Sequence, residues 1–211
     1  MSTQAEARVR ADTIAYALHG NLYLNITSRC TLRCAFCSKF NGIWTVQNYY
    51  PLRLTRAQEP SVAQIIAAVS NARAYNEIVF CGLGEPTLRL YDALEAGHVL
   101  RRRGATVRIN TDGLANLVYG RDVTPDLEGN IDALSISLNA QNAATYNRHC
   151  RPTMPGSYQA MLDFARRARE FVPDIRLTAI EGLEGVDIPA CAAIAGRLGV
   201  RFHKRVLDDV G

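Results

Sequence analysis

Three cysteines, Cys30, Cys34 and Cys37, lie in one short run with the spacing C-x3-C-x2-C. Three thiolates on one loop are able to bind three irons of a cubane 4Fe–4S cluster, which leaves the fourth iron without a protein ligand. A structural zinc site prefers four ligands, commonly as two C-x2-C pairs, whereas the other cysteines of this chain are scattered singly. The spacing therefore favours a cluster with one open iron, at which an external ligand binds.

A second motif, Cys81-Gly-Leu-Gly-Glu-Pro, follows a short apolar run that is typical of a buried strand. Glycines allow a backbone to approach a ligand closely and to adopt unusual dihedral angles. Ligands of α/β proteins gather where the carboxyl ends of parallel strands meet. We therefore expect this turn to form part of the same site as the cysteines.

The two motifs together resemble those of the radical S-adenosylmethionine (radical SAM) superfamily, down to the aromatic Phe36 before the third cysteine. The resemblance implies that Cys30, Cys34 and Cys37 bind a 4Fe–4S cluster whose open iron binds S-adenosylmethionine. It also implies cleavage of that cofactor to a 5′-deoxyadenosyl radical, which abstracts hydrogen from a substrate. The cofactor-binding residues that it implies are Phe36, Gly82, Gly84, Glu85, Asn110, Ser137 and Asn139.

Length and composition fit one globular enzyme domain. The chain has 211 residues and a formal net charge of +4, too small an excess to indicate nucleic-acid binding. We expect a single radical SAM core domain over 1–211, with the cluster loop at 28–40. No apolar stretch is long enough to span a bilayer, and the N-terminus lacks an apolar signal core. A cytoplasmic protein without membrane partners is therefore expected.

Strand and helix patterns alternate along the chain. The sequence predicts strands over 22–27, 77–81, 106–110, 132–139, 175–180 and 200–206. It predicts helices over 61–73, 90–103, 141–149, 158–171 and 188–198. Such alternation implies a parallel sheet with right-handed crossovers. Six units match the partial (β/α)6 barrel with parallel strands that the resemblance implies.

Residue alternation within the strands predicts what lies inside that barrel. Leu134 and Ile136 share one face of their strand, while Ser135 and Ser137 share the other. The apolar face is expected to meet the helices. The small polar residues then face a lumen that holds a ligand, unlike the apolar interior of a packed barrel.

Four cationic residues are predicted to face the lumen or its mouth, namely Arg108, Arg176, His203 and Arg205. A surplus of positive charge there favours a substrate carrying a carboxylate or phosphate, bound by charge-assisted hydrogen bonds. Solvent-exposed surface charge is the competing interpretation.

Three segments resemble the short radical SAM proteins associated with TatD-type metal-dependent hydrolases. They are Gly-Leu-Gly-Glu-Pro-Thr-Leu-Arg-Leu, Tyr-Asn-Arg-His-Cys-Arg-Pro and Leu-Gly-Val-Arg-Phe-His-Lys-Arg. This resemblance implies a small-molecule or nucleotide-type substrate, a TatD-type hydrolase as partner, and an electron donor such as flavodoxin or ferredoxin. Two alternatives stay open: an enzyme like the glycyl-radical activases, which acts on a protein, and a non-catalytic iron–sulfur or zinc protein.

Overall fold

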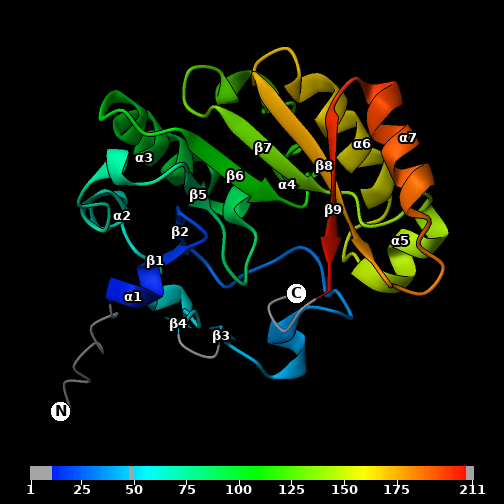
Figure 1. The fold of residues 1–211 in the computed structure, drawn as a ribbon, viewed down its shortest axis with the longest axis horizontal. Helices are drawn as coiled ribbons and strands as arrows, with labels where there is room; N and C mark the ends of the chain where they lie inside the picture. Colours follow the sequence, from blue (N-terminus) through cyan, green and yellow to red (C-terminus); the bar gives the residue numbers. More distant parts are fainter. Residues whose placement is uncertain (1–10, 48–49, 208–211) are drawn as a thin grey trace.

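The computed structural model describes residues 11–47 and 50–207. Its main element is a seven-stranded sheet in the order β1-β2-β5-β6-β7-β8-β9 (Figure 1). The strands are β1 Ala15–Leu18, β2 Asn21–Leu24, β5 Ile78–Phe80, β6 Val107–Thr111, β7 Ala133–Ser137, β8 Asp174–Glu181 and β9 Arg201–Val206. From β2 to β9 all neighbours are parallel, and β1 adds an antiparallel edge.

The prediction of a partial barrel of parallel strands is confirmed. The six parallel strands form one curved sheet with its helices on the outer side (Figure 1). β1 and β9 are its two edges, and they do not pair with each other in the described part of the chain. The sheet is therefore open, and its concave face is accessible from the side.

Helices cover the convex face of the sheet. They are α2 Val62–Ala67, α3 Leu90–Arg102, α4 Ala115–Tyr119, α5 Ala143–Cys150, α6 Ser157–Ala168 and α7 Ile188–Leu198, while the short α1 Ala11–Ile14 contacts edge strand β1 instead. Capping residues mark where several of these helices begin and end. Ser61 and Gln64 form a capping box at the start of α2, and Asp187 accepts the Ala190 N–H at the start of α7. Gly199 ends α7 in the left-handed region.

Some predicted boundaries differ from the structure. The helix expected over 61–73 ends at Ala67, and residues 72–74 form a separate 3-10 turn after an Asn71 cap. The first strand ends at Leu24, because the following residues leave the sheet to begin the cysteine loop. The prediction contains neither β1 nor the small hairpin of β3 Thr45–Val46 and β4 Tyr50–Pro51.

Burial confirms the predicted phases of β7 and β8, whereas in β9 Val206, expected to face the helices, is exposed. Leu134 and Ile136 of β7 are buried in the main apolar core, as are Ile175 and Leu177 of β8. The large core side chains thus lie between sheet and helices, and the polar positions of the strands face the concave side. None of the helices that the structure describes is long and apolar enough to cross a bilayer.

Candidate active site

The cysteine loop runs from the end of β2 to the 3-10 helix η1 Ser38–Asn41, across the carboxyl ends of the strands (Figure 1). Backbone hydrogen bonds connect this loop to the end of α5. The Arg33 N–H donates to the Cys150 carbonyl at 3.0 Å, and the Ala35 N–H donates to the His149 carbonyl at 2.8 Å. Inside the loop, the Cys37 N–H donates to the Cys34 carbonyl at 3.1 Å. The position of Cys34 is therefore fixed by hydrogen bonds on both sides.

The glycine motif packs against this loop. A Cβ atom on Gly84 would lie 2.2 Å from the Thr27 carbonyl oxygen and 2.7 Å from that of Arg29. One on Gly82 would lie 2.2 Å from Oδ1 of Asn25. Both glycines also line the cavity described below. The close backbone approach predicted for the motif is therefore, in this structure, an approach to the cysteine loop.

Glu85 joins two segments, its own turn and the end of β6, through its buried carboxylate. Oε1 accepts hydrogen bonds from the Thr87 N–H at 2.9 Å, the Thr87 hydroxyl at 2.7 Å and the Thr111 hydroxyl at 2.8 Å. Oε2 accepts from the Asp112 N–H at 2.7 Å. All four donors belong to the turn itself or to the end of β6. Glu85 therefore stabilises the turn and couples it to that strand.

Asp112 is a buried acid beside Glu85. Burial, with the negative charge of Glu85 adding to it, raises the pKa of Asp112 well above its usual range. Its carboxylate accepts hydrogen bonds from the Thr31 hydroxyl and, at 3.0 Å, from the Leu114 N–H. Thr31 follows Cys30 directly, so this contact connects the cysteine loop to the end of β6.

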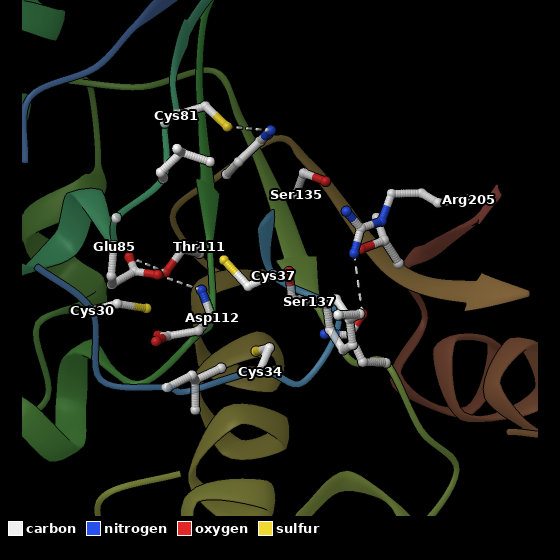
Figure 2. A pocket seen from close by; sticks show the side chains of 18 residues that line it. Cys30, Cys34, Cys37, Cys81, Glu85, Thr111, Asp112, Ser135, Ser137 and Arg205 are labelled. Carbon is white, nitrogen blue, oxygen red and sulfur yellow. Dashed lines mark hydrogen bonds between the residues drawn. The ribbon is translucent and has the colours of Figure 1, made fainter. Parts of the chain in front are cut away.

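The three thiols face one cavity of about 210 Å³ (Figure 2). Cys30, Cys34 and Cys37 line it on the loop side. Burial raises the pKa of all three thiols; for Cys34 a hydrogen bond with the Cys150 thiol is a larger cause still. Coordination to a metal overcomes such a shift by deprotonating the thiol.

The spacing of the cysteines separates two kinds of metal site. Within 11–47 and 50–207, no three Cys, His, Asp or Glu side chains converge closely enough to share a single metal ion. A tetrahedral zinc site requires such convergence. In a cubane each thiolate binds a different iron, so the ligand sulfurs stand farther apart. The three thiols that face this cavity fit the three thiolate ligands of a 4Fe–4S cluster with one open iron.

The wall opposite the cysteines is polar. Ser135 and Ser137 of β7 and Thr178 of β8 line the cavity, with Cys81 at the far end from Cys34 (Figure 2). The hydroxyls of Ser135 and Ser137 form no hydrogen bond within the residues that the structure describes. Partnerless hydroxyls facing a cavity are what a polar ligand needs, so this wall fits S-adenosylmethionine.

Asn110 and Asn139 also line the cavity, but their amides have protein partners. The Asn110 amide nitrogen donates to Cys81 Sγ at 3.4 Å, and its oxygen accepts from Arg108. The Asn139 amide nitrogen donates to Cys150 Sγ at 3.6 Å, and its oxygen accepts from Arg205 Nη2 at 3.2 Å. Both amides thus hold other side chains in place.

The four predicted substrate cations fall into two groups. Arg205 lines the cavity (Figure 2). Arg108 and Arg176 lie toward the amino ends of their strands and share Glu77: Arg108 Nη2 is 2.9 Å from its carboxylate and Arg176 Nη2 is 3.8 Å from it. His203 lies on edge strand β9 and is largely exposed; partial desolvation of its ring, with the nearby arginine charges adding to it, lowers its pKa. The charges of Arg176, Arg205 and Arg108 all act on His203, but of the four residues only Arg205 lines the cavity.

Three residues of this site escaped the prediction: Thr31, Glu77 and Cys150. Cys150 lies in the segment Tyr-Asn-Arg-His-Cys-Arg-Pro, which the sequence analysis used only for the resemblance to the TatD-associated proteins. Its contact with Cys34 depends on how α5 ends against the cysteine loop. Sequence spacing contains no signal for that contact, nor for the pairing of Thr31 with Asp112 across the site.

Comparison with known proteins was consistent with this geometry. The model of the radical SAM superfamily matches residues 24–189. The chain is 30% identical over 150 residues to a GTP 3′,8-cyclase of Lactiplantibacillus plantarum, covering 69% of this chain and 40% of that protein. The chain thus spans less than half the length of this curated relative.

Solved structures share the fold at lower identity. TYW1 with a lysine-pyruvate adduct bound has a TM-score of 0.63 and 16% identity, over 89% of this chain and 65% of that one. Streptococcus suis SuiB bound to its precursor peptide SuiA has a TM-score of 0.66 and 14% identity, over 93% of this chain and 41% of that one.

Proposed function

We propose that this chain, which belongs to the radical SAM superfamily, binds its 4Fe–4S cluster through Cys30, Cys34 and Cys37 and acts on a small anionic, nucleotide-derived substrate. Enzymes of the superfamily use this cluster with S-adenosylmethionine, and together the two groups supply a 5′-deoxyadenosyl radical that abstracts hydrogen from substrate. The observation that carries the proposal is the cavity itself, with three thiols on one wall and two partnerless hydroxyls on the other.

The residues around the cavity have separate tasks in this proposal. The three thiolates would hold three irons of the cluster and leave one open for S-adenosylmethionine. Ser137 would donate a hydrogen bond to that cofactor, and Phe36 would pack against its adenine. The Glu85 carboxylate couples the glycine turn to the end of β6 through four protein hydrogen bonds, and the Glu85 N–H donates to the Arg29 carbonyl of the cysteine loop at 2.7 Å. Leu32 and Leu83 contribute apolar surface that limits the access of water.

Two observations support a nucleotide-type substrate. Arg205 brings a guanidinium to the cavity wall, where its planar set of donors suits a phosphate or carboxylate. The curated relative is named for a reaction of GTP, which carries phosphates. A protein substrate, as in the glycyl-radical activases, has no comparable support. The non-catalytic alternative is overturned, because membership of this superfamily makes the chain an enzyme.

The proposed function also implies an electron donor, a protein partner and a cellular compartment. Reduction of the cluster requires an external one-electron donor such as flavodoxin or ferredoxin. The chain is proposed to act as a single radical SAM domain over 1–211, to belong to the TatD-associated group and to work beside a TatD-type hydrolase. Its six cysteines, unpaired in the structure, support a reducing, cytoplasmic setting.

The proposal is tested by product formation under reducing conditions. Anaerobically reconstituted protein, mixed with dithionite and S-adenosylmethionine, should release 5′-deoxyadenosine, measured by liquid chromatography and mass spectrometry. Nucleotide pools are then screened for compounds that accelerate this release, and Arg205→Ala should abolish the acceleration. Arg205→Lys serves as the matched variant and should restore it only in part. The proposal of an anionic substrate would be contradicted if the accelerating compound were neutral, or if its effect were unchanged in Arg205→Ala.

A further inference from the structure

Two segments of the chain that meet at the cysteine loop carry cations and no acids. The sequence contains no aspartate or glutamate between Asp12 and Glu59, and none between Asp132 and Asp163. The first stretch includes the cysteine loop, and the second includes α5. Their lysines and arginines are Arg29, Arg33, Lys39, Arg53, Arg56, Arg148 and Arg151. The surplus is local, because the whole chain has 24 lysines and arginines against 20 acids.

Hydrogen bonds bring three exposed arginines of these segments to the same loop. The Arg33 N–H donates to the carbonyl oxygen of Arg151 at 3.3 Å. The Leu54 N–H donates to the Ser28 hydroxyl at 2.8 Å, which brings the neighbouring Arg53 to the start of the loop. The side chains of Arg33, Arg53 and Arg151 are all exposed. We call these three arginines the basic face.

The arginines of the basic face have no acidic partner. Among residues 11–47 and 50–207, none of the three forms an ion pair. The Arg33 guanidinium instead lies 5.8 Å from the centre of the Phe40 ring, and that of Arg53 lies 5.2 Å from the centre of the Trp44 ring. Phe40 is 44% exposed and the nearby Ile43 is 41% exposed. Unpaired cations around exposed apolar side chains fit a contact surface for an acidic protein.

The basic face lies over the predicted cluster ligands. Cys37 directly precedes η1, and the Phe40 N–H donates to the Cys37 carbonyl at 3.0 Å. The three thiols of the loop face the cavity, whereas Arg33 and Phe40 of the same loop are exposed to solvent. An electron that enters through this face therefore crosses the cysteine loop alone before it reaches the cluster.

We propose that an acidic one-electron carrier protein docks on the basic face and reduces the cluster from there. One electron passes between the partners, so the carrier is oxidised and the cluster is reduced by one electron, and no bond forms or breaks. Attraction between opposite charges speeds such encounters, and salt screens it. Nucleic acid is a second kind of acidic partner, but the position of the face over the cluster ligands favours the carrier. The inference rests on the proposed function, which supplies the cluster.

The test follows the reduction of the reconstituted cluster by an acidic flavodoxin in a stopped-flow spectrometer. A variant that combines Arg33→Gln, Arg53→Gln and Arg151→Gln should be reduced about tenfold more slowly than wild type at low salt. Photoreduced 5-deazariboflavin, a small uncharged reductant, should reduce the variant and the wild type equally well.

The matched control removes the same charge from the opposite end of the sheet. Exposed arginines at the C-terminal ends of α3 and α6 lie beside the amino ends of the strands, and the control variant combines Arg102→Gln, Arg103→Gln and Arg169→Gln. Its reduction by flavodoxin should stay within roughly twofold of wild type. An equal loss of rate in both variants would mean that net charge alone matters, and would overturn the docking surface.

The remaining outcomes separate this inference from the proposed function. If flavodoxin reduces the basic-face variant as fast as wild type, the inference is wrong, and loss of binding to single-stranded RNA by that variant would then assign the face to nucleic acid. If the variant does not fold or takes up no iron, the wild type decides. Its rate should fall at least fivefold between about 0.05 and 0.5 M salt, and a rate independent of salt overturns the inference. A wild-type protein that takes up no iron overturns the proposed function as well.

Discussion

The two ends of the barrel lumen differ in whether their polar side chains contact one another or face a cavity. Toward the amino ends of the strands, Arg108 and Arg176 share the single carboxylate of Glu77, and the buried Nε of Arg176 has no hydrogen-bond partner among the described residues. Toward the carboxyl ends, Ser135 and Ser137 face a cavity without protein partners. Mutually paired charges stabilise a fold, whereas partnerless groups at a cavity await a ligand. The comparison supports the proposal that the chemistry takes place at the carboxyl end, where the three thiols face the same cavity as the two hydroxyls.

The largest effect is expected at the cysteine loop. Cys34→Ala should abolish retention of the 4Fe–4S cluster, because two thiolates hold a cubane insecurely. Iron content and the brown absorbance after anaerobic reconstitution measure this. Cys191→Ala removes a thiol far from the cavity and should keep the wild-type iron content. Full iron retention by Cys34→Ala would show that the loop is not the cluster site.

The next effect comes from the contact between the two loops. Gly84→Ala should destabilise the fold by about 3 kcal/mol and impair cluster retention, because its Cβ meets the backbone oxygens of Thr27 and Arg29. Gly196→Ala is the matched control: it lies in α7 with no atom within 4 Å of the new Cβ. That change should stabilise by roughly 0.5–1 kcal/mol. Thermal unfolding distinguishes them, and equal effects would refute the contact.

A smaller change is expected on the polar wall. Ser137→Ala removes one hydrogen bond to S-adenosylmethionine and should weaken its binding by about 1–3 kcal/mol, between several-fold and roughly a hundredfold in affinity. The cluster spectrum should stay intact. Calorimetric titration of the reconstituted protein with the cofactor gives the affinity. Wild-type affinity in both Ser135→Ala and Ser137→Ala would remove this wall from the cofactor site.

The smallest effect is expected at the amino end. Arg176→Ala should leave the affinity for S-adenosylmethionine within about twofold of wild type, because Arg176 does not line the cavity and its ion pair with Glu77, at 3.8 Å, is long. The same titration measures it. A large loss of cofactor affinity would mean that the lumen is continuous in function and that the two ends do not differ as described.

Much of the fold was accessible from sequence. The order of strands and helices and the inward face of β7 follow from residue periodicity, which local sequence contains. The antiparallel edge strand β1 escaped prediction, since its pairing with β2 is a tertiary contact. The cysteine loop and the glycine turn were recognisable because the residue types needed for their chemistry are fixed along the chain.

Other parts of the site depend on which groups the tips of the side chains contact, and sequence periodicity does not specify those contacts. Alternation predicts that Arg108 and Arg176 point inward but not that Glu77 receives both. It places Asn139 at the cavity but not its amide on Cys150. The assignments of Phe36, Ser137 and Arg205 to ligands stay predictions, because their roles concern molecules outside the chain.

The most direct test of the central claim is Mössbauer spectroscopy of protein reconstituted with 57Fe. If three cysteines leave one iron open at this cavity, addition of S-adenosylmethionine should change the isomer shift and quadrupole splitting of one iron site and leave the others as they were. The same titration in Cys191→Ala should give the same result. The account would be contradicted if S-adenosylmethionine changed the Mössbauer parameters of no iron site, or if the protein bound zinc in place of a cluster.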